Sequence, residues 1–428
     1  MAEGVAAELV SAFASGAALT AWALYLGCST LVVGVIAAIP FLAQVVQLPG
    51  AWLTSTFGAR RVALVTVGLA RQMFWPLVLL PWAPISPEAK RGILIAVAMA
   101  HHGFGMLCNN AWVSWMGDLV PARIRGRYFG RRNAICTLAS AAATFATGLL
   151  LDHGRAAQLS PEILAGLAMA ACLAGAASTW LMSLKHNPGS PAARPFEIRT
   201  ALRPLQDPLA RRFLAYQIAW NAAVGLAAPF FGIYLLRDLR LGFALMTAHT
   251  ASVAIARTIS APRWGRGVDR VGARPVLVVC CLGIAASPFL WSCAGPDRLW
   301  PLALDAVLGG ILLGGHGVAA FALPLAVAPR AERPFYLALF AMTGGAAYAL
   351  ATALGGTLAE ALPPTFTWWG HSFVALQVIF LLSVAARLLA TVVAFRVSEP
   401  DSRSVRELYR VTRMGLSRWL FGAVTVAE

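Results

Sequence analysis

The residues of this chain that could do chemistry are polar side chains inside long apolar stretches. Two adjacent histidines, His101 and His102, lie within the stretch 92–115, and His316 lies within 301–328. A histidine exchanges a proton near neutral pH and also donates or accepts hydrogen bonds. These side chains could therefore contact a polar solute, carry a proton, or only satisfy a polar group of a neighbouring helix.

Amides extend this set. Asn109 and Asn110 follow the histidines by two helical turns, and Gln217 and Asn221 are four residues apart, which places them on one face of a helix. An amide can hold a solute, although hydrogen bonds between helices are an equally common role. The candidate substrate contacts are His101, His102, Asn109, Asn110, Gln217, Asn221 and His316.

Charged residues inside the apolar stretches are few, and each costs about 3 kcal/mol in hydrocarbon, so such a residue tends to be paired or functional. They are Arg71, Arg257, Arg387 and, near the end of its stretch, Asp305. No carboxylate lies in the middle of a stretch. This disfavours a cation site built on a buried acid, and it leaves histidine as the group that could bind a proton.

The elements that position these residues are membrane helices. Hydrophobic residues make up 59% of the 428 residues, charged residues only 12%, and the mean hydropathy is +0.71. A soluble domain carries about 25% charged residues. Apolar stretches of roughly 20 residues, the length that spans a bilayer, occur at 9–27, 30–49, 62–82, 92–115, 134–151, 162–184, 212–236, 243–262, 275–294, 301–328, 336–361 and 371–396.

The charge of the connecting segments predicts the orientation. With the N-terminus on the cytoplasmic side, 25 of the 34 Lys and Arg residues fall in cytoplasmic segments, six in outer loops and three inside spans. Membrane proteins retain Lys and Arg on the cytoplasmic side, so both termini are expected there. The net charge of +16 is then a consequence of topology, and the Arg-rich run 123–132 is expected to contact anionic lipid head groups.

The sequence lacks the motifs of a secreted protein, a metal-binding protein or an enzyme. Residues 1–10 hold no Lys or Arg, so a cleaved signal peptide is not expected. The seven cysteines show no CxxC pair or metal-ligand spacing, and no catalytic triad or phosphate-binding Gly–Lys loop is present. We expect no enzyme, no cofactor, no metal site and no nucleic-acid partner.

An internal repeat divides the chain. At an offset of 214 residues, the run Gly58, Ala59, Arg60 matches 272–274, and His102-Gly103 matches 316–317. At an offset of 208, Pro121, Arg125, Tyr128, Gly148 and Asp152 meet Pro329, Arg333, Tyr336, Gly356 and Glu360. The Pro- and Arg-rich segment 185–211 lies between the copies. The sequence predicts an N-terminal half 1–184, a cytoplasmic linker 185–211, a C-terminal half 212–396 and a cytoplasmic tail 397–428 that carries an amphipathic helix.

The stretch 265–274, "GRGVDRVGAR", resembles the Gly-x-x-x-Asp-Arg-x-Gly-x-Arg loop signature of the major facilitator superfamily. The segments 118–133, "DLVPARIRGRYFGRRN", and 227–239, "AAPFFGIYLLRDL", resemble bacterial permeases of that superfamily. The resemblance implies an all-α membrane protein with 12 transmembrane helices in two pseudo-symmetric six-helix bundles. It also implies that the first, fourth, seventh and tenth helices line a central cavity, where they would present the candidate substrate contacts.

The same resemblance implies a conformational latch on the cytoplasmic side, formed by Gly265, Asp269, Arg270, Gly272 and Arg274. Asp269 would hold helix ends together in the outward-open state. The alternative is a solvated loop whose arginines only mark the inside. The N-terminal copy has Ser55 and Thr56 in place of Asp-Arg, so we expect the latch to be asymmetric.

The resulting prediction is a monomeric transporter of a small solute in the cell inner membrane, active or facilitated, that works by alternating access. Protons are a candidate co-substrate, so the chain could be a symporter or a uniporter. The alternative is a non-transporting receptor or accessory protein that retains the fold. Polar groups on the cavity-lining helices favour a cavity and so favour transport.

The topology can be tested with reporter fusions. A reporter at the C-terminus that is active only in the cytoplasm should be active, because 25 of 34 basic residues mark that side. A fusion after residue 86 should be inactive. A C-terminal fusion that reports the outer side would contradict the predicted topology.

Overall fold

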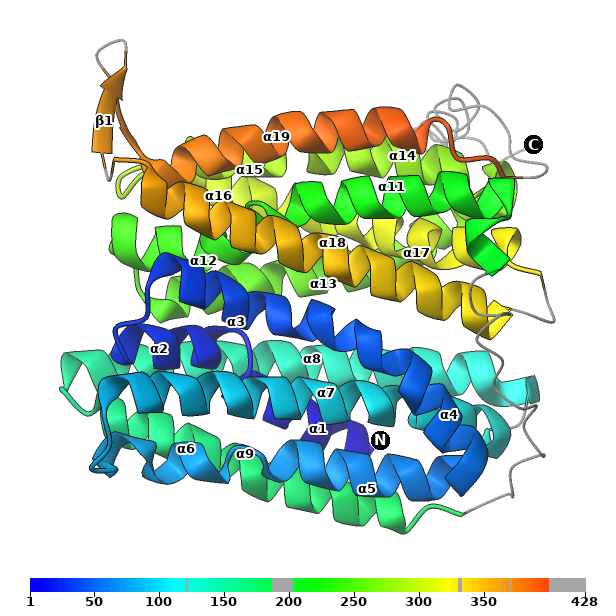
Figure 1. Cartoon of the computed structure of the whole chain (residues 1–428), viewed down its shortest axis with the longest axis horizontal. Helices are drawn as coiled ribbons and strands as arrows, with labels where there is room; N and C mark the ends of the chain where they lie inside the picture. The colour runs from blue at the N-terminus through cyan, green and yellow to red at the C-terminus, as the bar shows by residue number, and fades with distance from the viewer. Residues whose placement is uncertain (121, 187–202, 330–332, 364, 369–370, 400–428) are drawn as a thin grey trace, which may run out of the picture.

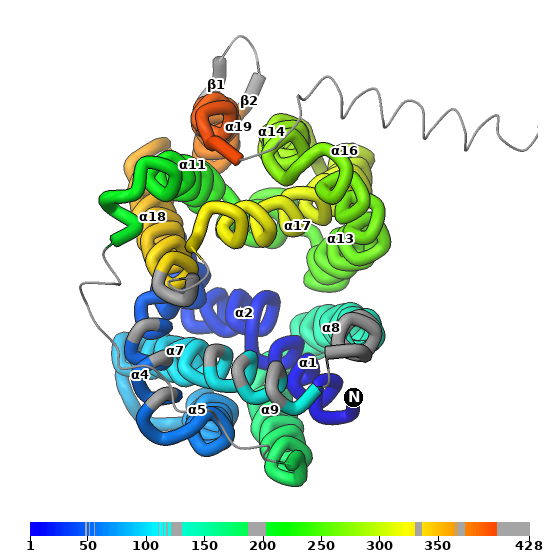
Figure 2. Tube along the Cα trace, turned by 90° about the vertical axis from the view of Figure 1, so that its right-hand side faces the viewer, coloured from blue at the N-terminus to red at the C-terminus, as the bar shows by residue number. Residues whose placement is uncertain are grey.

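The computed structural model describes residues 1–120, 122–186, 203–329, 333–363, 365–368 and 371–399, and it is almost entirely helical (Figure 1). Most of the predicted linker and the tail from residue 400, with its predicted amphipathic helix, lie outside the described residues. Seen along the helices, the described chain forms two bundles, one from each half of the sequence (Figure 2).

The N-terminal bundle holds α1 (Ala2–Ala14), α2 (Ala17–Tyr25), α3 (Thr30–Leu42), η1 (Ala43–Val46), α4 (Gln47–Phe57), α5 (Ala59–Gln72), α6 (Trp75–Leu79), η2 (Leu80–Trp82), α7 (Pro87–Leu119), α8 (Ala122–Ala156) and α9 (Ser160–Ser183). Several predicted spans are built from consecutive short helices. The first span, for example, breaks between α1 and α2 at Gly16, where φ is +51°.

The C-terminal bundle holds η3 (Arg203–Leu205), α11 (Pro208–Gly225), η4 (Ala228–Phe230), α12 (Phe231–Ile233), the π-helical η5 (Tyr234–Asp238), α13 (Phe243–Val271), α14 (Ala273–Ile284), α15 (Ser287–Ser292), α16 (Trp300–Leu304), the π-helical η6 (Asp305–Gly309), α17 (Gly310–Val327), α18 (Arg333–Ala361) and α19 (Ala375–Ala394). An antiparallel hairpin, β1 (Thr365–Trp368) with β2 (His371–Val374), connects α18 to α19, so the start of the predicted span 371–396 is a strand rather than a helix.

Ten helical segments of the described chain are long and apolar enough to cross a membrane. Two predicted spans are not among them. The apolar segment Thr30–Val46 is shorter, and α13 has the length but carries four arginines and an aspartate in its second half. The fold is therefore that of a multi-pass helical membrane protein, as predicted.

The repeat at an offset of 214 produces the same local structure twice. Gly58 and Gly272 have φ of +84° and +95°, and their N–H groups donate to the Thr54 and Val268 carbonyls, which ends the preceding helix. The matching arginines then reach the last helix of their own half. Arg60 donates to the Ser183 carbonyl at 2.8 Å, and the Arg274 guanidinium donates to the Phe395 carbonyl at 2.6 Å. These bonds satisfy carbonyls that a helix end leaves unpaired.

The apolar core is continuous across the two halves at one end of the molecule only. One cluster joins Trp22 and Leu151 of the N-terminal half to Phe230 and Phe243 of the C-terminal half. Towards the other end each half has a separate cluster, with Trp115 in one and Val276 in the other. The described halves therefore share a core at the end where α2 meets α12.

The two positive-φ glycines predict a stability effect. Alanine at Gly58 or Gly272 would occupy a backbone region that costs a side chain about 1–3 kcal/mol, so each variant should lower the thermal unfolding midpoint of the purified protein. Gly265→Ala is the matched control, because Gly265 lies inside α13 and a Cβ there meets nothing within 4 Å. Equal midpoints for Gly272→Ala and Gly265→Ala would contradict the assignment.

Candidate functional site

The two halves are held together by a carboxylate at the end of α8. Both oxygens of Asp152 accept hydrogen bonds from the first turn of α13 in the other half, from the N–H groups of Phe243 and Ala244 at 2.7 Å each. These N–H groups open α13 and have no partner within that helix. The negative carboxylate also faces the positive end of the helix dipole.

The repeat partner of Asp152 caps a helix of the N-terminal half from the C-terminal half. Glu360, at the end of α18, accepts a hydrogen bond at 2.9 Å from the N–H of Leu31, in the first turn of α3. Glycine allows both approaches. A Cβ at Gly356 would lie 3.0 Å from Cα of Leu31, and a Cβ at Gly148 would collide with the Thr247 hydroxyl. We name the pair Asp152 and Glu360 the carboxylate latch, and the end of the molecule where it lies the latched end.

A further hydrogen bond between the halves lies beside the latch, where the Arg237 guanidinium donates to the Thr30 hydroxyl at 2.9 Å. Among the described residues, every side-chain hydrogen bond that joins the two halves lies at this end. The shared core lies there as well. The hydrogen bonds between the bundles are thus at one end, and farther along α18 the two halves are packed together, with Tyr348 stacked on Phe41.

A pocket of about 310 Å³ in the N-terminal half collects several predicted site residues. We name it the N-half pocket; its polar lining is Glu3, Ser11, Arg71, His101, Asn109 and Arg132. Glu3 is buried, with Lys185 Nζ at 2.9 Å and an Arg132 nitrogen at 3.8 Å from its carboxylate. Arg71 is buried, and its Nη1 makes no hydrogen bond with the described residues. The pocket region therefore holds three cations against one carboxylate.

The two adjacent histidines have different surroundings. His101 lines the N-half pocket, and its Nδ1 is 2.9 Å from the Ala70 carbonyl. His102 does not line that pocket, and its buried Nε2 makes no hydrogen bond within the described part of the chain. Asn109 is exposed in the pocket. The side chain of Asn110 lies outside the described residues.

His316 anchors a second polar group, in the C-terminal half. Its Nε2 lies 3.0 Å from the Tyr216 hydroxyl, and its ring stacks on Trp220 with the centroids 5.1 Å apart. Arg257 is exposed, and its guanidinium forms neither a hydrogen bond nor an ion pair with the described residues. A Cβ at Gly317 would lie 3.2 Å from its guanidinium, which places Arg257 beside His316. We name these four side chains, on α11, α13 and α17, the C-half cluster.

The predicted amides of α11 serve packing in this structure. The Asn221 amide donates to the Gln217 carbonyl at 2.8 Å within its own helix. Both side chains lie against Gly344 of α18, where a Cβ would come within about 3.1 Å of them. Within the described part of the chain these amides therefore pack against a neighbouring helix without the hydrogen bond between helices that was the alternative for them.

The remaining predicted intramembrane charges are buried and bonded. Asp305 accepts a hydrogen bond from the Trp291 indole at 2.8 Å and faces the His249 Nε2 at 3.2 Å. Arg387 donates to the Ile284 carbonyl at 3.1 Å. His249, on α13, was missed because the sequence does not show that its helix passes Asp305.

Most of the predicted loop signature, residues 265–274, is helical in the structure. Gly265, Asp269 and Arg270 are in the last turns of α13 rather than in a loop, because that helix continues to Val271 before Gly272 ends it. Asp269 is exposed and forms no hydrogen bond or ion pair with the described residues. Arg274 binds Phe395 of its own half, and Glu399 accepts hydrogen bonds from the N–H groups that begin α14.

Sequence reasoning also missed Glu3, Arg132, Tyr216 and Trp220. Glu3 and Arg132 lie outside the predicted spans, and Tyr216 and Trp220 look like ordinary apolar positions. The latch carboxylates had been visible only as repeat partners at an offset of 208. A carboxylate that recurs near the end of a span, one turn after a glycine, was the available signal.

Comparison with known proteins agrees with this architecture. The family model of the Major Facilitator Superfamily matches residues 221–426. No curated protein sequence gives a significant match. This match assigns the C-terminal half of the chain to the major facilitator superfamily, and the solved structures described next extend the likeness in fold to nearly the whole chain.

Three solved structures share the fold. The nucleoside transporter NupG has a TM-score of 0.68 and 13% identity, over 92% of this chain and 98% of that one. A D-xylose-proton symporter has a TM-score of 0.70 and 13% identity, over 94% and 96%. The inward open conformation of the xylose transporter XylE from E. coli has a TM-score of 0.66 and 14% identity, over 96% and 97%.

Because the halves are joined at the latched end, the structure predicts that a reagent in solution reaches the N-half pocket and the C-half cluster from the opposite side. In a variant without native cysteines, Asn109→Cys and Arg257→Cys should react with a membrane-impermeant maleimide only from the side opposite the latched end, because the halves are joined at that end. Ser86→Cys, in the loop before α7, should react from the latched side. Labelling of Asn109→Cys from the same side as Ser86→Cys would contradict this structure.

Proposed function

We propose that the chain is a secondary transporter that carries a small organic anion across the cell inner membrane by alternating access. The observation that carries this proposal is the excess of cations in the N-half pocket and the C-half cluster. Arg71, Arg132, Lys185 and Arg257 oppose the single carboxylate of Glu3. Guanidinium groups bind carboxylates and phosphates strongly because two N–H groups can donate in parallel.

The hydrogen-bonding groups of the two halves supply the rest of such a site. His101 and Asn109 belong to the N-half pocket, and His316 belongs to the C-half cluster. α17 lies on the side of the C-terminal bundle that is nearest the N-terminal bundle (Figure 2). A solute held between the bundles would contact both sets, as in transporters whose sites lie between their repeats.

The carboxylate latch indicates which state of the transport cycle this conformation represents. If the basic segments are cytoplasmic, as their charge predicts, the latched end faces outwards and the protein is closed to the outside. Asp269, at the other end, has no bonding partner among the described residues in this state. We propose that Asp269 joins the halves in the opposite state, when the carboxylate latch has opened.

An imposed proton gradient distinguishes the two modes of coupling, uniport and proton symport. A uniporter equilibrates its solute without any gradient, whereas a proton symporter concentrates it when the outside is acidic. The likeness to a D-xylose-proton symporter shows only that this fold can use protons. His102 and His316 are the histidines whose removal should abolish pH dependence in the symport case.

The proposal is tested by solute uptake into proteoliposomes. We expect uptake of at least one labelled carboxylate from a panel of lactate, succinate and glutamate, with little uptake of uridine or D-xylose. Arg257→Gln should reduce initial uptake at least tenfold, because it removes a cation from the site. Arg298→Gln, which neutralises an exposed arginine in the loop before α16, is the control and should leave uptake unchanged.

Other outcomes separate the alternatives. Uptake of uridine or D-xylose without any carboxylate would contradict the anion assignment and keep the transporter. If a protein with a wild-type unfolding midpoint moved none of these solutes and none of them raised that midpoint, the non-transporting receptor would be favoured.

A further inference from the structure

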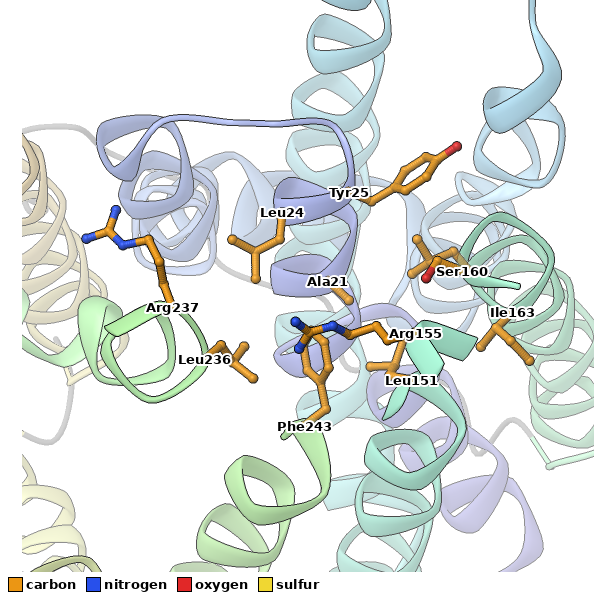
Figure 3. Close-up of a pocket in the computed structure, with 11 residues that line it drawn as sticks. Ala21, Leu24, Tyr25, Leu151, Arg155, Ser160, Ile163, Leu236, Arg237 and Phe243 are labelled. Carbon is orange, nitrogen blue, oxygen red and sulfur yellow. The ribbon is translucent and has the colours of Figure 1, made fainter. Parts of the chain in front are cut away.

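A second pocket of about 310 Å³ lies at the latched end, away from the candidate substrate site (Figure 3). Both halves build its wall. Leu24, Arg155 and Ser160 line it from the N-terminal half, and Leu236, Arg237 and Phe243 line it from the C-terminal half. We name it the interface pocket.

Its charge comes from Arg155, in the last turn of α8. The guanidinium points into the pocket over the Phe243 ring, 5.7 Å from the ring centroid (Figure 3). It makes no hydrogen bond or ion pair with the described residues. Arg237 turns away in the same view and is bonded to Thr30 and Asp238.

The nearby carboxylates do not neutralise Arg155. Asp152, one turn earlier on α8, places both oxygens on the N–H groups of α13. Asp238 pairs with Arg237. Most of the remaining wall is aliphatic, with Leu24, Leu151 and Leu236 around the guanidinium (Figure 3). The pocket therefore combines one uncompensated cation with apolar walls.

We propose that the interface pocket binds an amphiphilic anion, an acidic head group on a short apolar chain, with the head group on Arg155. The chain would lie against the leucines, because burial of each CH₂ group contributes about 0.8 kcal/mol. A charge-assisted hydrogen bond from a guanidinium to a carboxylate or phosphate is stronger than one between neutral groups. The Ser160 hydroxyl supplies one more polar contact.

Occupancy of this pocket favours the latched state. Phe243 lies under the Arg155 guanidinium, and the N–H of the same residue donates to Asp152. This step rests on the alternating access proposed above: if the halves separate at this end, the wall formed by Leu236 and Phe243 leaves the pocket. A ligand that binds only the closed arrangement shifts the equilibrium towards it. The bound anion therefore acts as an inhibitor of the opening step.

Thermal unfolding of the full chain in nanodiscs of zwitterionic phosphatidylcholine tests the proposal, with decanoate as the anion and decanol as its uncharged analogue. We expect decanoate to raise the unfolding midpoint with saturation and decanol to have little effect. Arg155→Gln should weaken the apparent decanoate affinity at least tenfold. Arg298→Gln, an exposed arginine outside the pocket, should keep the wild-type affinity.

A second arm distinguishes a free acid from a lipid. Nanodiscs with phosphatidylglycerol should raise the midpoint of the wild type and not of Arg155→Gln if the head group of an anionic lipid fills the pocket. Stabilisation by decanoate alone identifies a free acid as the ligand. The proposal fails if Arg155→Gln responds to decanoate and phosphatidylglycerol as the wild type does, or if decanol stabilises as much as decanoate.

Discussion

The arrangement of the two halves depends on how the first N–H groups of two helices are satisfied. A helix start in or near a membrane has N–H groups without partners, and leaving them unbonded costs several kcal/mol. Here α13 receives its partner from Asp152 and α3 from Glu360, and each carboxylate belongs to the opposite half. The helix starts of each half are therefore satisfied by the other half, which fixes the closed end.

This arrangement also explains how the molecule could alternate. The carboxylates come from equivalent positions of an internal repeat, so both interfaces can open in one movement of the bundles. Each half keeps its own core at the other end, and Arg60 and Arg274 tie helices within a half rather than between halves. Rigid halves that are joined at one end, by a shared apolar core and a few exchangeable hydrogen bonds, are suited to a rocking motion.

Much of the fold could be predicted from the sequence, because apolar length, basic loops and repeated Gly-Ala-Arg runs each have a direct physical meaning. The candidate site was predicted less completely. The N-half pocket contains the predicted His101, and the C-half cluster contains the predicted His316 and Arg257. The amides of Gln217 and Asn221, in contrast, contact a neighbouring helix. Periodicity does not show which residues of different helices meet, so the proximity of Glu3 to Lys185, 182 positions away, could not be predicted. The continuation of α13 through the loop signature was missed for a related reason, since its arginines are typical of loops.

The most direct test is a pair of distances measured by spin labels in a chain whose seven native cysteines are replaced. One pair joins residues 86 and 298 at the latched end, and the other joins residues 61 and 270 at the opposite end. Asp152→Asn combined with Glu360→Gln removes both charges. We expect this variant to lengthen the first distance and to shorten the second. Distances that stay at their wild-type values in a folded variant would contradict this expectation.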